Sequence, residues 1–324
     1  MSKKNIFKSM LNHSREHRES ALLCSTFSLC LICALADRFL LHRSDEILGS
    51  LVFEIIIFLI PLFVYFSLSD KNLSARTVAK EMNISKISHR LIFLPIFAAM
   101  LLVTGTLLLD MLFFGIYDIT GGFTLYGHLT ANSDGSLVST ILMIVTFALL
   151  PAIFEEVMFR KLMTRTYAKK GLFSAMLISG IFFSLTPFSL RLIPSFFLAG
   201  MIYCLIFIVT GSLLTSIIAH FLFNMYGLFL RTNIANYFVA SADVYVLVIS
   251  TIILFLISAL LFAGILSKLF VAYAKAGKTP PYLPDTKKGF SASVKSAFSI
   301  FKIPANLACI IIYAVFIVVF AFLG

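Results

Sequence analysis

The chain has 324 residues, of which 60% are hydrophobic and only 13% are charged, and its formal net charge is +11. About a quarter of the residues in a soluble globular domain are charged, so this composition excludes such a domain and indicates a polytopic helical membrane protein. The positive charge is typical of the cytoplasmic loops of such proteins, so we expect no nucleic-acid partner.

Apolar runs of about 20 residues predict membrane-spanning helices, because a helix of that length crosses the hydrocarbon core of a bilayer. The predicted fold class is therefore all-α, a polytopic transmembrane helical bundle with about nine spanning helices. The fifth run is short. The runs cover residues 20–40, 47–68, 91–116, 137–165, 172–187, 193–210, 213–231, 244–270 and 304–323.

The distribution of basic residues predicts the orientation of these helices, because Lys and Arg collect in cytoplasmic loops. With the N-terminus in the cytoplasm, only four of the 26 Lys and Arg residues fall outside. The four are Arg38, Arg43, Arg191 and Arg231. We therefore expect a multi-pass integral membrane protein with a cytoplasmic N-terminus, in the plasma membrane if the host is a bacterium. The polar leader of about 20 residues is long for a signal peptide, so we expect the first helix to be uncleaved.

The five cysteines all lie in apolar stretches, which is typical of small buried side chains rather than of a disulfide framework. Cys30 and Cys33 have the C-x-x-C spacing, but no second pair and no nearby histidine accompany them. This pattern does not indicate a metal site. The longest basic loop, 274–303, is predicted to be a solvated inner loop near anionic headgroups.

Two adjacent glutamates interrupt the fourth run, in Phe154-Glu155-Glu156-Val157-Met158-Phe159-Arg160. A charged side chain near the bilayer centre costs about 3 kcal/mol, so such residues are candidates for functional sites. Glu156 and Arg160 are four apart and face each other on a helix, whereas Glu155 points about 100° away and has no partner on its own helix. The spacing predicts a structural acid, Glu156, and a chemical one, Glu155. An ion-pair cluster that only locks helices together is the plainer alternative.

A second polar pair lies on the seventh run, where His220 and Asn224 are four apart and share one face of the helix. Both side chains can donate hydrogen bonds to a developing oxyanion. A lone histidine on an apolar face is more often a core residue, but the asparagine one turn later favours a polar site. Glu54 and Asp110 also lie in apolar runs and could line the same cavity or simply reach a hydrogen-bond partner.

Together these motifs resemble the CPBP (CAAX-processing and bacteriocin-processing, Abi) family of intramembrane proteases. The resemblance rests on Glu155-Glu156-x-x-x-Arg160, the turn at Gly211 and His220-x-x-x-Asn224, and it covers about 138–230. It implies that Glu155 is the general base for a water, that Glu156 and Arg160 support it, and that His220 and Asn224 stabilise the oxyanion. The water can be bound without a metal in this family, although a divalent metal such as zinc is an alternative.

The chain departs from the family pattern at its middle motif, where Phe182 matches but Thr186 occupies the position of a histidine. Threonine cannot accept a proton near neutral pH, but it can hold a water by hydrogen bonding. General acid–base assistance is typically worth about 10²–10⁴-fold, so three outcomes stay open: the change lowers the activity, abolishes it, or is made up by another group. The predicted topology also puts Thr186 at the outer end of the fifth helix, away from Glu155, unless that short helix is sunk into the bundle. His128, in an outer loop, is an unsuitable substitute.

Three functions follow. The first is an intramembrane endopeptidase (a hydrolase) acting on membrane-associated peptides or proteins, with the bilayer as its surroundings. In a bacterium this would serve peptide maturation, bacteriocin immunity or regulated cleavage. The second is a pseudoprotease that binds peptides without cutting them, and the third, disfavoured by the lack of an internal repeat, is a transporter. The expected domains are a cytoplasmic segment (1–20), N-terminal helices (21–136), a CPBP-like core (137–231), and C-terminal helices with a basic cytoplasmic loop (232–324).

Overall fold

The computed structural model describes the chain over seven stretches, and the loop that contains His128 lies outside them. The described residues are 3–39, 46–69, 91–115, 136–231, 233, 244–283 and 289–323. Within them every regular element is a helix, and eight helical stretches are long and apolar enough to cross a membrane. The predicted all-α polytopic bundle is confirmed, and the chain is an integral multi-pass membrane protein.

The helices begin and end close to the predicted runs. Their bounds are α1 (Lys3–Phe39), α2 (Glu46–Glu54), α3 (Ile60–Ser69), α5 (Phe93–Phe114), α7 (Leu137–Ile144), α8 (Leu150–Glu156), α9 (Arg165–Tyr167), α10 (Leu172–Leu185), α11 (Ile193–Thr210), α12 (Leu213–Met225), α14 (Val244–Lys275), α15 (Phe290–Phe298) and α16 (Pro304–Leu323). Four π-helical stretches connect or extend them, at Ile55–Leu59, Val145–Leu149, Val157–Thr164 and Tyr226–Leu230. Such stretches occur frequently at functional sites, and two of them flank the helix of the adjacent glutamates.

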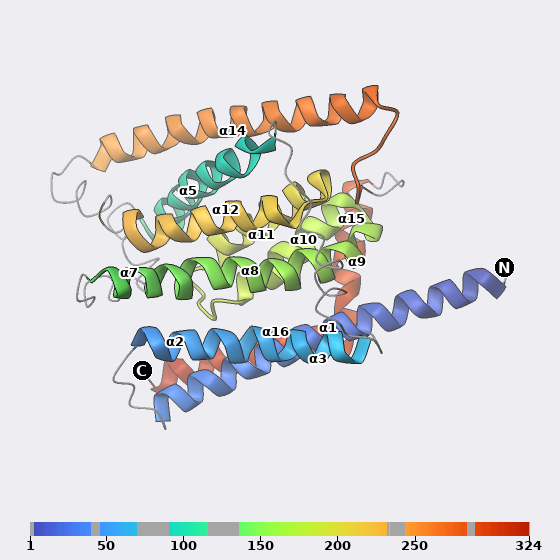
Figure 1. The fold of residues 1–324 in the computed structure, drawn as a ribbon, viewed down its shortest axis with the longest axis horizontal. Helices are drawn as coiled ribbons and strands as arrows, with labels where there is room; N and C mark the ends of the chain where they lie inside the picture. Colours follow the sequence, from blue (N-terminus) through green and yellow to red (C-terminus); the bar gives the residue numbers. More distant parts are fainter. Residues whose placement is uncertain are drawn as a thin grey trace.

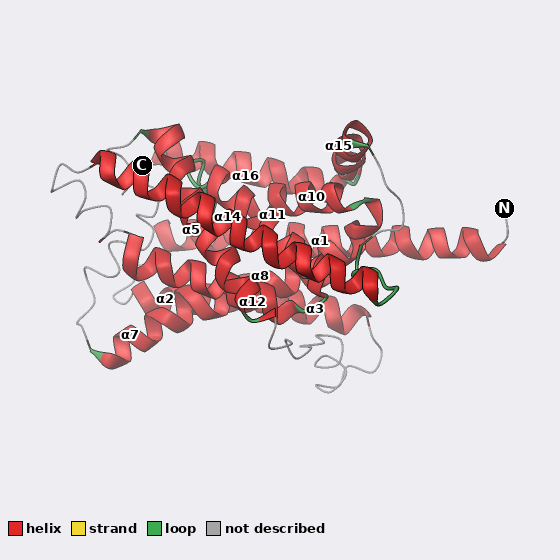
Figure 2. Cartoon of the chain, turned by 90° about the horizontal axis from the view of Figure 1, so that it is seen from above, coloured by secondary structure: helices red, strands yellow, loops and turns green. Residues whose placement is uncertain are grey.

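The helices run roughly side by side, and the two chain ends lie at opposite ends of the bundle (Figure 1). In this view α14 and α5 form the upper part, α12 and the α7–α8 helix the middle, and α1, α2, α3 and α16 the lower part. Figure 2 shows the same bundle from above, with the N-terminal end of α1 extending beyond the other helices. This extension is helical from Lys3 and continuous with the first span.

The predicted fifth span, α10, is the short helix of the bundle. Its 14 residues extend about 21 Å at 1.5 Å per residue, which is less than a hydrocarbon core of about 30 Å. After Leu185 the chain makes a turn in which Phe188 has a φ of 48°. A bulky residue at positive φ is a backbone outlier. Irregular backbone at membrane depth is tolerated where it is buried in protein or lines a wet cavity.

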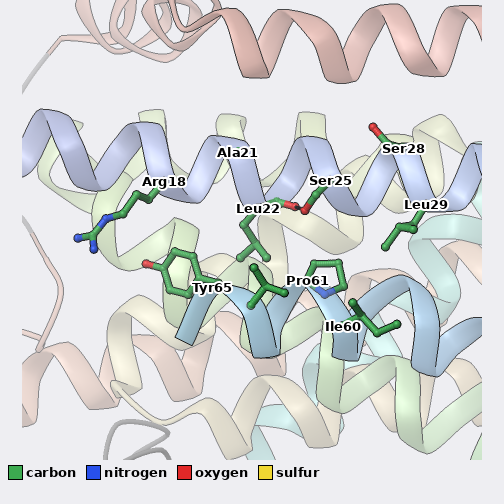
Figure 3. Close-up of a pocket in the computed structure, with 10 residues that line it drawn as sticks. Arg18, Ala21, Leu22, Ser25, Ser28, Leu29, Ile60, Pro61 and Tyr65 are labelled. Atoms are coloured by element: carbon green, nitrogen blue, oxygen red, sulfur yellow. Dashed lines mark hydrogen bonds between the residues drawn. The ribbon is translucent and has the colours of Figure 1, made fainter. Parts of the chain in front are cut away.

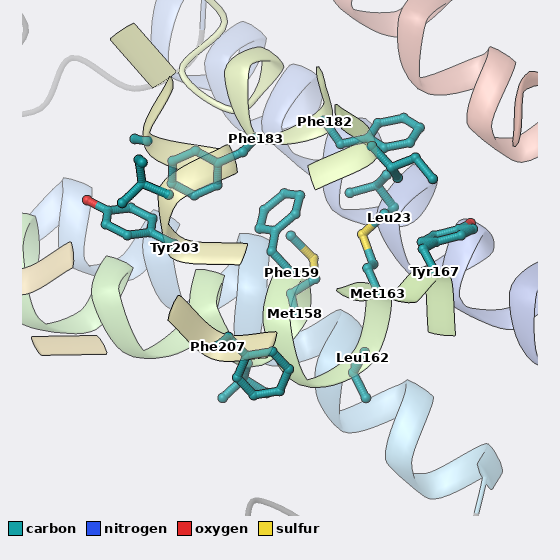
Figure 4. Close-up of a cluster of buried hydrophobic side chains, with 14 of the residues drawn as sticks. Leu23, Met158, Phe159, Leu162, Met163, Tyr167, Phe182, Phe183, Tyr203 and Phe207 are labelled. Atoms are coloured by element: carbon teal, nitrogen blue, oxygen red, sulfur yellow. The ribbon is translucent and has the colours of Figure 1, made fainter. Parts of the chain in front are cut away.

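A buried aromatic cluster holds α10 and α11 to the helix of the glutamates (Figure 4). The rings of Phe159 and Phe183 meet edge to face with centroids 5.3 Å apart, and Phe183 meets Tyr203 in the same way at 5.8 Å. The close approach of α11 depends on Gly200, since a Cβ atom there would lie 2.9 Å from the backbone of Gly180. The short helix is therefore fixed by packing within the protein rather than by its length in the bilayer.

The sequence predicted a solvated loop over 274–303. The structure shows that some residues of this loop pack against the bundle. Tyr282 stacks on Phe207 of α11 at a centroid distance of 5.0 Å, and its backbone N–H donates to the carbonyl of Ile208. Further on, Ser174 of α10 donates to the carbonyl of Ser293 in α15. Residues Tyr282 and Ser293 of this loop therefore contact α11 and α10, while residues 274–279 are exposed.

Candidate active site

The predicted pair of Glu156 and Arg160 is confirmed by the structure. Arg160 Nε donates to Glu156 Oε2 at 2.9 Å, and Nη2 donates to Oε1 at 3.3 Å. Both side chains are completely buried. Two hydrogen bonds from one guanidinium fix the carboxylate in a single orientation, which is the geometry that makes arginine suited to this role.

The guanidinium of Arg160 is also held on its other sides. It donates through Nη1 to the hydroxyl of Ser179 in α10, and this hydroxyl in turn donates to the carbonyl of Gly200 in α11 at 3.0 Å. The carbon Cζ of Arg160 lies 5.0 Å from the ring centroid of Phe183 and 5.5 Å from that of Tyr203. A chain of hydrogen bonds and cation–π contacts thus links three helices through one arginine.

His220 joins the same cluster from α12. Its Nδ1 lies 3.1 Å from Glu156 Oε1, its ring stacks on Tyr203 at 5.0 Å, and Phe183 meets it edge to face at 5.5 Å. The ring is therefore held through Nδ1 and by contacts with two aromatic rings, and Nε2 has no partner among the described residues. Asn224, one turn later, donates from Nδ2 to the carbonyl of Ala148 at 3.5 Å.

Glu155 points away from this cluster into a cavity of about 350 Å³. Its side chain is buried, and its Oε2 atom has no hydrogen-bond partner among the described residues. The walls come from α1, from α2 with the π-helical stretch after it, and from α8, α11, α16 and the turn after α10. A water occupies about 30 Å³ of liquid, so the cavity has room for several waters if polar groups line it.

Thr186 lines the same cavity as Glu155. The short α10 ends at the depth of the glutamate, so the threonine is beside it rather than on the outer surface of the bundle. Its hydroxyl donates to the carbonyl of Phe183 at 2.8 Å. The hydroxyl proton is therefore already used within its own helix, and the oxygen is left as a hydrogen-bond acceptor.

The comparisons with known proteins gave one match, to a protein family. Residues 137–226 match the family described as type II CAAX prenyl endopeptidase Rce1-like. We call this matched region, residues 137–226, the Rce1-like core. This match confirms the resemblance to the CPBP family and supports an intramembrane protease of the CAAX type at the level of the family. Searches among curated proteins and solved structures gave no match.

The Rce1-like core holds the six residues singled out from the sequence, but on two faces of α8. Glu156, Arg160 and His220 form a buried hydrogen-bonded cluster on one face, with Asn224 one turn along α12. Glu155 and Thr186 share the cavity on the other, and neither His220 nor Asn224 is among the described residues that line it. The arrangement follows from the sequence, because consecutive helical residues point about 100° apart.

Two partners in the Rce1-like core were not predicted from the sequence. Ser179 lies three residues before Phe182 of the middle motif and was not singled out, yet it is the residue that connects Arg160 to α11. Tyr203, which stacks on His220, carried no signal, since an aromatic residue in an apolar helix is ordinary. The sequence held one hint of the role of Ser179, namely that this polar residue lies one helical turn before Phe183.

Outside the core, Asp110 of α5 has a structural partner. It pairs with Arg231 at the end of the seventh span and accepts a hydrogen bond from Ser195 of α11 at 3.4 Å. Of the two alternatives, Asp110 therefore reaches a partner, whereas Glu54 lines the cavity of Glu155.

A second pocket, of about 570 Å³, lies between α1 and α3 (Figure 3). Leu22, Leu29 and Ile60 contribute to its apolar walls, Ser25 and Ser28 add hydroxyls, and Arg18 lies at one end. None of the described residues that line it is an acid, a histidine or a cysteine. It has no carboxyl, imidazole or thiol group among these residues, so the chemistry is assigned to the cavity of Glu155.

The described side chains around the two glutamates do not fit a metal ion. Over the described ranges, no three His, Cys, Asp or Glu side chains come close enough together to hold one. His220, the imidazole nearest to the glutamates, has its Nδ1 bonded to Glu156. The mechanism proposed below therefore contains no step at a metal.

Proposed function

We propose that this protein is an intramembrane endopeptidase that hydrolyses peptide bonds of membrane-associated peptides or proteins. One observation carries the proposal: in a region that matches a peptidase family, one glutamate of the pair is neutralised and the other is free in a cavity. An unpaired carboxylate beside space for water is the arrangement expected of a general base.

In the proposed mechanism the Glu155 carboxylate accepts a proton from a water as the water oxygen attacks the carbonyl carbon of the substrate. The carbonyl oxygen becomes an oxyanion, which His220 Nε2 and Asn224 Nδ2 stabilise by hydrogen bonds. Glu156 accepts from Arg160 and also from His220 Nδ1, so Nε2 carries a hydrogen only when the ring is an imidazolium. The C–N bond then breaks, and the leaving nitrogen takes up a proton.

The substrate carbonyl would lie at the seam between α8 and α12, which pack against each other. Glu155 would hold the water on one side of that seam, and the polar pair of α12 would face the oxyanion on the other. We also propose that the N-terminus is cytoplasmic, on the evidence of the basic residues, so that substrates are cut from the cytoplasmic side.

The proposal is tested with purified protein in lipid nanodiscs. A prenylated peptide ending in Cys-aliphatic-aliphatic-X, the substrate class in the family description, carries a fluorophore and a quencher across the expected cut. A second assay identifies the membrane peptides of producing cells that change with the protein. Cleavage by the wild type and its loss in Glu155→Gln would support the proposal. The matched control is Glu16→Gln, which removes a carboxylate that pairs with Lys170 outside the cavity.

A pseudoprotease is the second candidate, and one observation favours it. Thr186 stands at the histidine position of the family, and its hydroxyl donates to Phe183 of its own helix, so it cannot relay a proton. Equal peptide profiles for wild type and Glu155→Gln, together with binding of the uncleaved probe, would favour this function and overturn the peptidase.

A further inference from the structure

The cavity of Glu155 contains a second carboxyl group, that of Glu54. Glu54 is the last residue of α2 and lies more than 80 positions before the region that matches the peptidase family. Its Oε2 atom, like that of Glu155, is buried without a hydrogen-bond partner among the described residues. Two carboxyl groups without partners among the described residues therefore line one cavity.

Among the acidic side chains that the structure describes, these two are the exception. Each of the others contacts a basic group. The pairs are Glu16 with Lys170, Glu19 with Arg15, Asp110 with Arg231, and Glu156 with Arg160. Burying an ionised carboxylate is costly unless it is paired, yet these two line the same cavity without a basic partner among the described residues. Their shared position suggests a shared use.

The local structure around Glu54 differs from a regular helix. The π-helical stretch Ile55–Leu59 begins directly after it, and Ile57 and Phe58 of this stretch line the cavity with it. Thr186 lies on the wall supplied by the turn after α10. A carboxyl group thus shares the cavity with the threonine that occupies the position of the missing histidine.

We propose that Glu54 and Glu155 share one proton and act as a general acid–base pair, with Glu54 taking the proton-transfer role of the absent histidine. The inference rests on the proposed peptidase function and adds a catalytic residue to it. The physical basis is that two carboxyl groups in one poorly solvated cavity do not both ionise, since like charges repel strongly there. One stays a carboxylate, able to accept a proton, and the other stays an acid, able to donate one.

The reaction balances with this pair alone. The Glu155 carboxylate takes one proton of the water, the water oxygen forms the new C–O bond, and the carbonyl π electrons move to the oxygen. The tetrahedral intermediate then collapses, the C–N bond breaks, and protonated Glu54 gives its proton to the leaving nitrogen. Protonated Glu155 and ionised Glu54 remain, and transfer of one proton through the cavity water restores the starting pair.

Other titratable groups face the pair. Cys30 and Cys33 of α1 line the cavity, and Glu156 with Arg160 lies on the adjacent face of α8. The bidentate ion pair of Glu156 and Arg160 is internally neutralised. The remaining ionisable groups on the cavity wall are thiols, which do not carry charge when buried in apolar surroundings. Glu54 is therefore the described group best suited to exchange a proton with Glu155.

The experiment compares wild type, Glu54→Gln, Glu54→Asp, Glu155→Gln and the control Glu16→Gln in nanodiscs, with the fluorogenic peptide as probe. Loss of general acid–base assistance predicts a fall in kcat of about 100-fold or more for Glu54→Gln, with KM little changed. Glu54→Asp, which keeps the acid, should retain more activity than Glu54→Gln. Adding Thr186→His to Glu54→Gln should restore part of the rate, because the imidazole returns a proton-transfer group to the same cavity.

An infrared titration of the same variants distinguishes a shared proton from a purely structural role of Glu54. A structural role would leave the titration midpoint of the carboxyl groups unchanged. If the pair shares a proton, the midpoint at which the protonated carboxyl band disappears should shift by about one pH unit or more when either glutamate is replaced. Glu16→Gln should leave it in place.

The outcomes separate the two proposals. A Glu54→Gln variant within twofold of wild type, while Glu155→Gln is inactive, would overturn the role of Glu54 and leave the peptidase intact. An unmoved infrared midpoint would overturn the shared proton. Wild-type protein that cleaves no membrane peptide would overturn both the peptidase and the pair.

Discussion

Replacing Arg160 by alanine should be among the most destabilising single substitutions in this chain. The guanidinium is completely buried, donates to both oxygens of Glu156 and to Ser179, and lies against the ring of Phe183. Its removal leaves the buried carboxylate of Glu156 with His220 as its remaining hydrogen-bond partner. Breaking a buried ion pair by removing one partner costs about 3–5 kcal/mol, and we expect a loss of this size in the free energy of unfolding.

The measurement is reversible unfolding in mixed micelles of a mild detergent and dodecyl sulfate, followed by circular dichroism. Arg160→Lys should cost less, because it keeps the charge but loses the bidentate geometry. The double variant Arg160→Met with Glu156→Gln should lose less free energy of unfolding than the two single variants lose in total. The reason is that each single variant leaves one buried charge without its partner, whereas the double variant removes both charges. The control Glu16→Gln breaks a partly exposed pair and should change stability by at most about 1 kcal/mol. An Arg160→Ala protein within about 1 kcal/mol of wild type would refute the reasoning.

Three further substitutions test the surrounding structure in the same assay. In Gly200→Ala the new Cβ would lie 2.8 Å from Phe183 Cβ, so α11 must move away from α10 at a cost of about 1–3 kcal/mol; unchanged stability would contradict the close packing. In Tyr203→Phe a buried hydroxyl without a partner among the described residues is removed, so stability should stay the same or rise by up to about 1 kcal/mol; a clear loss would indicate a hidden partner. Asp110→Asn should cost about 3 kcal/mol by weakening the pair with Arg231, while cleavage per folded molecule stays unchanged; a selective loss of cleavage would place Asp110 at the site.

Features that depend on neighbouring residues were predictable from the sequence. The ion pair of Glu156 and Arg160 follows from a spacing of four on a helix, and the structure has it. The opposite orientation of Glu155 follows from the 100° step between consecutive residues. The helices Ile193–Thr210 and Pro304–Leu323 lie where the apolar runs indicate, because hydrophobic length in a bilayer is read directly from the chain.

Features that depend on how separate helices meet were not predictable. Sequence spacing suggested that His220 and Asn224 share a face, but it did not indicate that His220 contacts Glu156. The sequence left Glu54 and Asp110 as equivalent alternatives, whereas the structure puts one in a cavity and the other in an ion pair. No local pattern distinguishes these two outcomes, because each depends on the partner that another helix presents.

The amino-acid sequence by itself determined a many-spanning helical protein and which acidic group on α8 would be neutralised. Only the tertiary structure decided that the short α10 ends beside Glu155 and that Glu54, from a distant helix, enters the same cavity. The physical reason is that hydrophobicity and helical periodicity act along the chain, whereas the depth and rotation of each helix are set by packing. Close contacts such as that of Gly200 with α10 form only when the helices assemble.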